Sequence, residues 1–188
     1  MDARGPLTSG RSEERQQVIR RLTPADAARY RELMLEAYES EPEAFTSTVA
    51  ERERLPLSWW SERLSEDAAA VDRVVGAFVA GRLVGAAGLS SAQRARTRHK
   101  GLLFGMYVRE EARGRGVGAL LVTEILRQAE QSARISVVQL TVSEGNAAAI
   151  RLYRRCGFAQ FGLEPFAVRI GPRFISKVHM WRAVTPAP

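Results

Sequence analysis

Apolar and polar positions follow two rhythms along this chain, and these rhythms predict strands and helices. Short apolar runs between glycine, proline or polar residues predict strands, whereas apolar residues that recur every three or four positions predict helices. The predicted strands span residues 18–22, 74–80, 83–89, 102–108, 137–142, 158–168 and 174–181. The predicted helices span residues 24–39, 58–66, 117–133 and 146–156.

Turn and capping residues mark the ends of several of these elements. Thr23 and Asp26 stand in the order of a capping box, which predicts that the first helix begins between them. Gly81 and Arg82 separate two apolar runs and predict a tight hairpin turn. The segment 40–56 contains proline and several glutamates, so we expect a connection there.

The strand predicted at 102–108 is a continuous apolar run. Such runs are typical of strands that are covered on both sides of a sheet. We therefore expect this strand to be buried on both faces.

Length and composition fit one folded domain. The chain has 188 residues, of which 45% are hydrophobic, and a chain of this length buries a sizeable core without disulfides or metals. We expect the polar residues 1–16 to form a flexible N-terminal arm, and residues 17–185 to form a single domain without internal repeats.

Cysteine and histidine are scarce, which limits the chemistry available. The single cysteine, Cys156, excludes a disulfide within the chain and is expected to be a small buried residue. With only two histidines, the sequence predicts no metal site. No apolar run reaches the roughly 20 residues of a membrane span, and the N-terminus does not resemble a signal peptide, so we expect a cytoplasmic protein without membrane contact.

Charge is unevenly distributed along the chain. There are 28 lysines and arginines against 21 aspartates and glutamates, which gives a formal net charge of +7. Residues 36–67 hold nine acidic and three basic residues and carry −6, which leaves +13 on the remainder. A segment with this charge is expected to attract cations.

A glycine-rich turn lies between the strand at 102–108 and the helix that follows it. The turn reads Arg113-Gly114-Arg115-Gly116-Val117-Gly118. At a helix N-terminus it would offer free backbone N–H groups and the positive end of the helix dipole, which together bind phosphate. A Walker A loop would end in Gly-Lys-Ser or Gly-Lys-Thr, and the dinucleotide fingerprint needs other glycine spacings, so neither motif fits.

Two motifs in sequence order carry a resemblance to a known family. The first is Met106-Tyr107-Val108 followed by the glycine-rich turn. The second consists of Asn146, Ala149, Leu152, Tyr153, Gly157 and Phe158. Together they resemble the acetyl-CoA signature R/Q-x-x-G-x-G/A and the downstream motif N-x-x-A-x-x-L-Y-x-x-x-G-F of the GNAT superfamily of N-acetyltransferases.

The resemblance implies a fold and a co-substrate. The fold would be α/β (α+β), with a mixed, mostly antiparallel sheet whose central strands splay apart between flanking helices. Acetyl-CoA would place its pyrophosphate on residues 113–118 and its pantetheine arm along the strand edge of Met106, Tyr107 and Val108. Asn146 would lie near the pantetheine, and Tyr153 would protonate the departing thiolate.

The implied reaction is direct attack of a neutral primary amine on the thioester, and the resemblance leaves its base open. Relatives that modify protein N-termini carry a glutamate five residues before the motif asparagine, where this chain has Thr141. Glu144, Glu164, His99 and a water molecule are the alternatives.

The acceptor would bind beside the first two helices and their connection, where Trp59 and Trp60 either pack a helix or line a pocket. Because residues 36–67 carry −6, we expect a cationic acceptor, either a small molecule or a peptide. A non-catalytic acyl-CoA-binding regulatory protein is the alternative, because the strand glutamate is missing. Nucleic-acid binding rests only on the net charge and the basic loop 93–100 and is not favoured. The oligomeric state stays open, a homodimer included.

Overall fold

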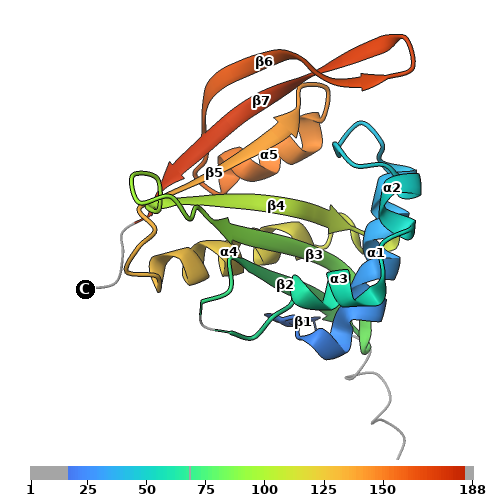
Figure 1. The fold of residues 1–188 in the computed structure, drawn as a ribbon. Coiled ribbons are helices and arrows are strands. Elements are labelled where there is room, and N and C mark those ends of the chain that lie inside the picture. Colours follow the sequence, from blue (N-terminus) through green and yellow to red (C-terminus); the bar gives the residue numbers. More distant parts are fainter. Residues whose placement is uncertain (1–16, 68, 185–188) are drawn as a thin grey trace, which may run out of the picture.

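The protein forms one sheet with helices on both faces (Figure 1). The structure is a computed structural model and describes residues 17–67 and 69–184. The strands are β1 (Gln17–Arg21), β2 (Asp72–Val79), β3 (Arg82–Ser91), β4 (Lys100–Val108), β5 (Val137–Ser143), β6 (Ala159–Ile170) and β7 (Arg173–Ala183). The helices are α1 (Ala27–Ser40), α2 (Val49–Glu53), α3 (Leu57–Glu62), α4 (Val117–Glu130) and α5 (Ala147–Arg155), with short 3-10 turns η2 (Pro24–Asp26) and η3 (Glu110–Ala112). The predicted arm 1–16 and position 185 lie outside the described residues.

The sheet is mixed and opens in its middle. Its strand order is β1-β2-β3-β4-β5-β7-β6, and neighbouring strands run antiparallel except for β4 and β5, which are parallel. These two strands pair over only three positions, from Lys100 with Val137 to Leu102 with Gln139. Beyond them the edge of β4 that faces β5 pairs with none of the described strands. The predicted fold class, including the splayed central strands, is confirmed.

Helices cover the two faces through separate apolar clusters. On one face, Leu121 and Ile125 of α4 pack with Val75 of β2. On the other, Leu33 of α1 and Trp60 of α3 belong to a second cluster that includes β2, β3 and β4 residues. Successive residues of a strand point to opposite faces, so the same three strands supply both clusters.

The first helix begins at a capping box, as predicted. Thr23 and Asp26 form it, and the first turn is the 3-10 turn η2. The Asp26 side chain accepts hydrogen bonds from both terminal nitrogens of Arg20, at 2.7 and 2.8 Å. Asp26 is only 4% exposed, and its bonds with Arg20 lower the pKa of its carboxyl to about 2.

We predict that Asp26→Asn lowers the free energy of unfolding by about 2 kcal/mol at pH 7, since each pKa unit corresponds to about 1.4 kcal/mol. The native pKa lies below the unfolded value. The stabilisation is therefore complete above about pH 4 and is lost as the pH falls through about 2. Urea unfolding of both proteins at pH 7, 4 and 2.5 measures this, and a difference that does not change with pH would contradict it.

Three local predictions were wrong. The connection 40–56 contains the short helix α2, which begins at a capping box formed by Thr48 and Glu51. The hairpin between β2 and β3 turns at Ala80 and Gly81, which both have positive φ, one residue earlier than expected.

The third error concerns β4, which is not buried on both faces. Leu102 is 47% exposed, and Phe104 and Gly105 are only partly covered. Its apolar side chains on this face line a pocket.

Candidate active site

The glycine-rich turn adopts the backbone conformation that only glycine takes easily. Gly114 and Gly116 have φ of 73° and 81°, and Gly116 occupies the N-cap position of α4. Among the residues that the structure describes, no side chain caps this helix, so the N–H groups of its first turn are left for a ligand. The sequence prediction of an anion cradle at this place is therefore consistent with the local geometry.

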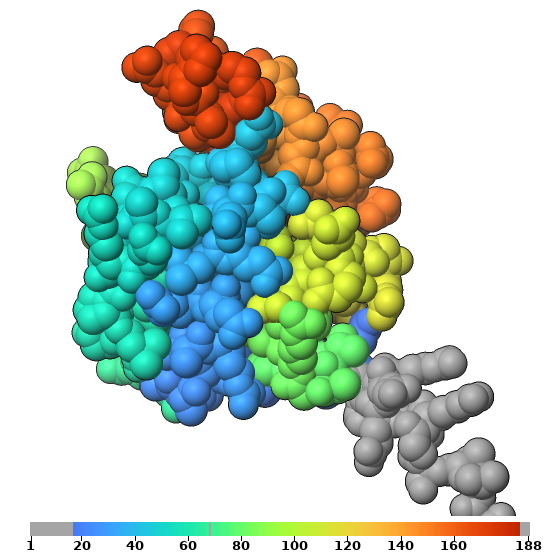
Figure 2. All heavy atoms as spheres, turned by 90° about the vertical axis from the view of Figure 1, so that its right-hand side faces the viewer, coloured from blue at the N-terminus to red at the C-terminus, as the bar shows by residue number. Residues whose placement is uncertain are grey.

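Arg113 ties the cradle to two other elements. Its Nε donates to the carbonyl of Val108 at 2.9 Å, and its guanidinium forms an ion pair with Glu41 at 2.8 Å. Glu41 follows the last residue of α1. The end of α1 and the start of α4 therefore meet at the cradle, and Figure 2 shows α1 (blue), the start of α4 (yellow) and α5 (orange) on the same face.

A bulge shapes β4 next to the cradle. Gly105 has φ of 59°, and the register with β3 shifts between Phe104 and Tyr107, opposite Ala87. The Tyr107 side chain turns toward α1, where its hydroxyl bonds to Glu36 and Ser40. The Met106 side chain, at this bulge, turns to the opposite face of the sheet and packs against the apolar cluster that includes α4.

Strand β4, α4 and α5 converge at Gly118. A Cβ added at Gly118 would lie 3.1 Å from Leu152 of α5 and 3.2 Å from Met106 of β4. The next residue on α5, Tyr153, is 5% exposed and packs edge-to-face on Phe158 with ring centroids 5.9 Å apart. Burial raises the pKa of Tyr153 above that of a free phenol. The two sequence motifs are thus in direct contact.

Asn146 has a structural role that the family motif alone did not predict. Its Oδ1 accepts a hydrogen bond from the N–H of Ala149 at 3.0 Å and so caps α5. The amide nitrogen of Asn146 is not needed for this cap.

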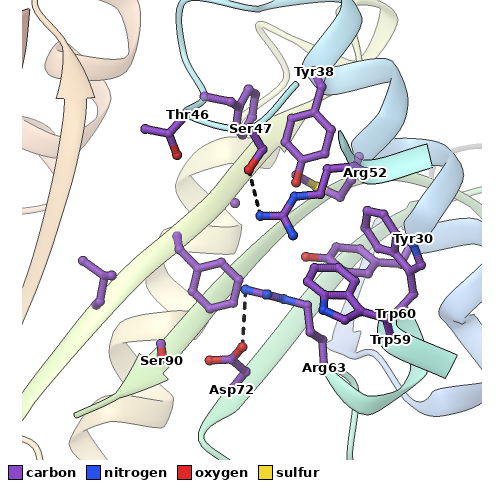
Figure 3. Close-up of a pocket in the computed structure, with 15 residues that line it drawn as sticks. Tyr30, Tyr38, Thr46, Ser47, Arg52, Trp59, Trp60, Arg63, Asp72 and Ser90 are labelled. Atoms are coloured by element: carbon purple, nitrogen blue, oxygen red, sulfur yellow. Dashed lines mark hydrogen bonds and ion pairs between the residues drawn. The ribbon is translucent and has the colours of Figure 1, made fainter. Parts of the chain in front are cut away.

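A pocket of about 310 Å³ lies on the α1 side of the sheet (Figure 3). Its walls are mainly aromatic, and its residues come from α1, α2, α3, β2, β3 and β4 and from the connections before α2 and after α3. The aromatic side chains are Tyr30, Tyr38, Phe45, Trp59, Trp60 and Phe104. Two arginines, Arg52 and Arg63, point into the cavity, and Asp72 is the acidic residue in its lining.

Comparisons with known proteins agree with this geometry. The sequence profile of the acetyltransferase (GNAT) family matches residues 30–158. The chain belongs to the GNAT family of acetyltransferases.

Relatives of this GNAT protein match it over stretches of different length. It is 32% identical over 124 residues to the L-amino acid N-acetyltransferase AaaT of Escherichia coli K12. The aligned residues are 65% of this chain and 74% of the relative. It is 35% identical over 69 residues to the L-methionine sulfoximine/L-methionine sulfone acetyltransferase of Pseudomonas aeruginosa. This shorter alignment includes 37% of this chain and 38% of the relative. A crystal structure of a GNAT-family acetyltransferase from Streptococcus pneumoniae superposes with a TM-score of 0.79 at 29% identity, covering 90% of this chain and 99% of that one.

This GNAT protein is therefore an acyl-CoA-dependent N-acyltransferase that moves an acetyl group from acetyl-CoA to an amine. The alternative of a non-catalytic regulator is not favoured. Among the described residues, no helix is both long and apolar enough to cross a membrane.

Eight residues of segment 36–67 line this pocket, but none of the segment's acidic side chains is among them. Glu36 pairs with Arg109, Glu41 with Arg113, and Glu43 with Arg173. A charge sum along the sequence does not reveal such pairs. The charges that reach the pocket from segment 36–67 are instead the guanidinium groups of Arg52 and Arg63.

The sequence had offered three residues as bases, and the structure separates them. His99 precedes β4 at the end that pairs with β5, about 23 Å of extended strand from Met106 at 3.3 Å per residue. The basic loop 93–100 lies at that same end, opposite the cradle (Figure 1). Glu144 is exposed at the end of β5.

Glu164 of β6 bonds to His179 of β7 at 2.9 Å, and His179 is paired in register with Thr141. Lys177, on the same face of β7, donates to the carbonyls of Glu43 and Ala44. Ala44 directly precedes Phe45, so this face of β7 contacts the segment that leads into the pocket wall. Of the three candidates, Glu164 lies next to the strand that contacts this segment, through its bond to His179.

Cys156 is half-buried at the C-cap of α5. Burial raises the pKa of its thiol, which keeps it in the protonated, unreactive form. We assign it no part in the reaction.

Sequence reasoning missed the arginines of the pocket. One signal was present: Thr48 and Glu51 are spaced as a capping box, which predicts α2 and hence the helical position of Arg52. Trp59 was considered for an acceptor wall, and it does line the pocket.

Proposed function

We propose that this enzyme acetylates the primary amine of a small molecule held in the pocket beside α1, α2 and α3. One observation carries the proposal: the bulge of β4 faces both sites. Phe104 and Gly105 line the pocket, and the neighbouring Met106 reaches Gly118 at the cradle. An amine in the pocket and a thioester along β4 would therefore meet at these three residues.

On the donor side, the free N–H groups of residues 116–119 would bind the pyrophosphate, and Arg113 and Arg115 would add positive charge. The unpaired edge of β4 at Met106, Tyr107 and Val108 would pair with the amides of the pantetheine arm. The amide nitrogen of Asn146 would face the same arm from the start of α5.

The chemistry needs no covalent enzyme intermediate. Holding both reactants in place supplies roughly 7–11 kcal/mol of barrier reduction. The amine nitrogen forms a bond to the acetyl carbon, the carbon–sulfur bond breaks, and the nitrogen loses a proton to solvent or a base. N–H groups at the β4 bulge would polarise the carbonyl, and Tyr153 would return a proton to the thiolate.

The size of the pocket and the names of the relatives support a small acceptor. About 310 Å³ accommodates an amino acid but not a folded protein segment. Two relatives are named for acetylation of L-amino acids or of L-methionine derivatives. We therefore propose a free amino acid or a similar amine.

A panel of acceptors tests this proposal by the release of CoA thiol from acetyl-CoA. We expect turnover with free amino acids and small amines, and at least tenfold lower kcat/KM when the same amino acid is the N-terminus of a decapeptide. Equal turnover of the decapeptide would contradict a small acceptor. A polyamine in the panel tests the cationic acceptor that the charge of segment 36–67 predicts.

The homodimer stays a prediction, as does the cytoplasmic location. The β6–β7 hairpin carries exposed apolar side chains, among them Phe161, Phe166 and Phe174. Sedimentation of the wild type across a concentration series measures the oligomeric state directly.

A further inference from the structure

We infer that Arg52 and Arg63 form a carboxylate-binding subsite, so that the acceptor is an amine that also carries a carboxylate. This inference rests on the proposed function and names the acceptor's second functional group. It starts from an unusual feature of the pocket: two guanidinium groups enter an aromatic cavity whose lining holds one carboxylate.

Arg52 has hydrogen-bonding capacity that the protein does not use. One terminal nitrogen donates to Ser47 Oγ at 2.7 Å, and the guanidinium stacks on Trp59, 4.7 Å from the ring centroid. Its Nε is buried and has no hydrogen-bond partner within the described part of the chain. A buried donor without a partner is costly, and a ligand oxygen would satisfy it.

Arg63 is held in place from three sides. Its guanidinium lies 4.9 Å from the ring centroid of Trp59 and 4.8 Å from that of Phe104, and it pairs with Asp72 at 3.3 Å. Such fixing reduces the entropy that a flexible side chain loses when it binds a ligand. With Asp72 neutralising one arginine, the pocket keeps one net positive charge.

Both guanidinium groups lie against one aromatic ring of the cavity, that of Trp59, at 4.7 and 4.9 Å from its centroid. Burial raises the pKa of Tyr38, and the charges of Arg52 and Arg63 each counteract that rise. Figure 3 shows the guanidinium groups of Arg52 and Arg63 pointing into the cavity from the same side, below Tyr38. A carboxylate placed there would accept from planar donor forks, the geometry in which arginine binds carboxylates best.

The position of the subsite suits an α-amino acid. Phe104 and Gly105 belong to the same lining as the two arginines, and they adjoin Met106 at the donor side. A carboxylate held by Arg52 would leave the amine directed toward the β4 bulge. The remaining aromatic walls would cover an apolar side chain of the acceptor.

The test compares pairs of acceptors that differ only in the carboxylate: L-phenylalanine with 2-phenylethylamine, and L-leucine with 3-methylbutylamine. For each pair, kcat/KM is measured at saturating acetyl-CoA in the wild type and in Arg52→Gln. The ratio within a pair, compared between proteins, cancels differences in amine reactivity. Arg54→Gln is the matched control, because Arg54 is exposed at the end of the same helix and does not line the pocket.

We expect the wild type to prefer the amino acid, and Arg52→Gln to reduce that preference about 10- to 100-fold, mainly through KM. Arg52→Lys should keep part of the preference, because lysine retains the positive charge but lacks the two parallel N–H donors of the guanidinium group. Arg54→Gln should leave it unchanged. Thermal unfolding with acetyl-CoA checks that each variant is folded and binds the donor.

An unchanged preference in a folded Arg52→Gln would overturn the inference, and so would a wild type that prefers 2-phenylethylamine or spermidine. In those cases the wild type still acetylates amines, so the proposed function stands. If no amine in the panel is acetylated, the proposed function fails and the inference falls with it.

Discussion

Replacing Gly116 by aspartate is expected to weaken acetyl-CoA binding at least 100-fold while the protein stays folded. Gly116 has φ of 81° at the N-cap of α4, and a Cβ there meets no atom within 4 Å. The side chain would project into the space assigned to the pyrophosphate and add a negative charge beside it. The carboxylate would itself cap α4 favourably, which offsets the backbone strain of about 1 kcal/mol at this φ.

Gly116→Asn is the control for this experiment, because asparagine has the same shape, tolerates positive φ and carries no charge. We expect it to weaken binding less than aspartate does. In the wild type, acetyl-CoA at a hundredfold excess over its Kd should stabilise the fold by about 2.7 kcal/mol. Calorimetric titration of the three proteins measures the difference, and unchanged affinity in folded Gly116→Asp would remove the cradle assignment.

The second large effect is expected from Tyr153→Phe, which should lower kcat about 100-fold with little change in acetyl-CoA affinity. The substitution keeps the edge-to-face contact with Phe158 and deletes only the hydroxyl. Because burial raises the pKa of Tyr153, the phenol stays protonated across the assay range. The defect should therefore be the same at pH 6 and pH 9.

Cys156→Ser provides the comparison, since Cys156 lies three residues further along the chain and has no assigned role. Its kcat should stay within about twofold of the wild type, because its thiol is protonated and half-buried. Steady-state kinetics at saturating acetyl-CoA measure both variants. Full activity in Tyr153→Phe would reject the role of proton donor.

Local sequence signals predicted the donor side of this enzyme better than the acceptor side. The glycine-rich turn and the capped helix α5 each lie within one short segment, so their residue types and spacing specify the structure directly. The family and the splayed sheet predicted from these motifs are confirmed. The roles of Tyr153, Asn146 and residues 113–118 stay predictions for the experiments above.

The acceptor pocket could not be predicted in the same way because distant segments build it. Arg52, Arg63 and Asp72 come from α2, the end of α3 and the start of β2. A sum of charges over residues 36–67 gave a negative segment, yet Glu41 and Glu43 pair with arginines from elsewhere. The apolar run of β4 likewise does not distinguish a face covered by protein from a face left open to a ligand.

The most direct test of the account is the identity of the product. The protein is incubated with acetyl-CoA labelled with ¹³C in the acetyl group and with a mixture of L-amino acids, and products are detected by mass spectrometry alongside free CoA thiol. We expect labelled N-acetyl-amino acids in a one-to-one ratio with the thiol released, and far less of both products in Gly116→Asp when acetyl-CoA is below the Kd of that variant. Release of thiol without a labelled N-acetyl product, or binding of acetyl-CoA without transfer to any amine, would contradict it.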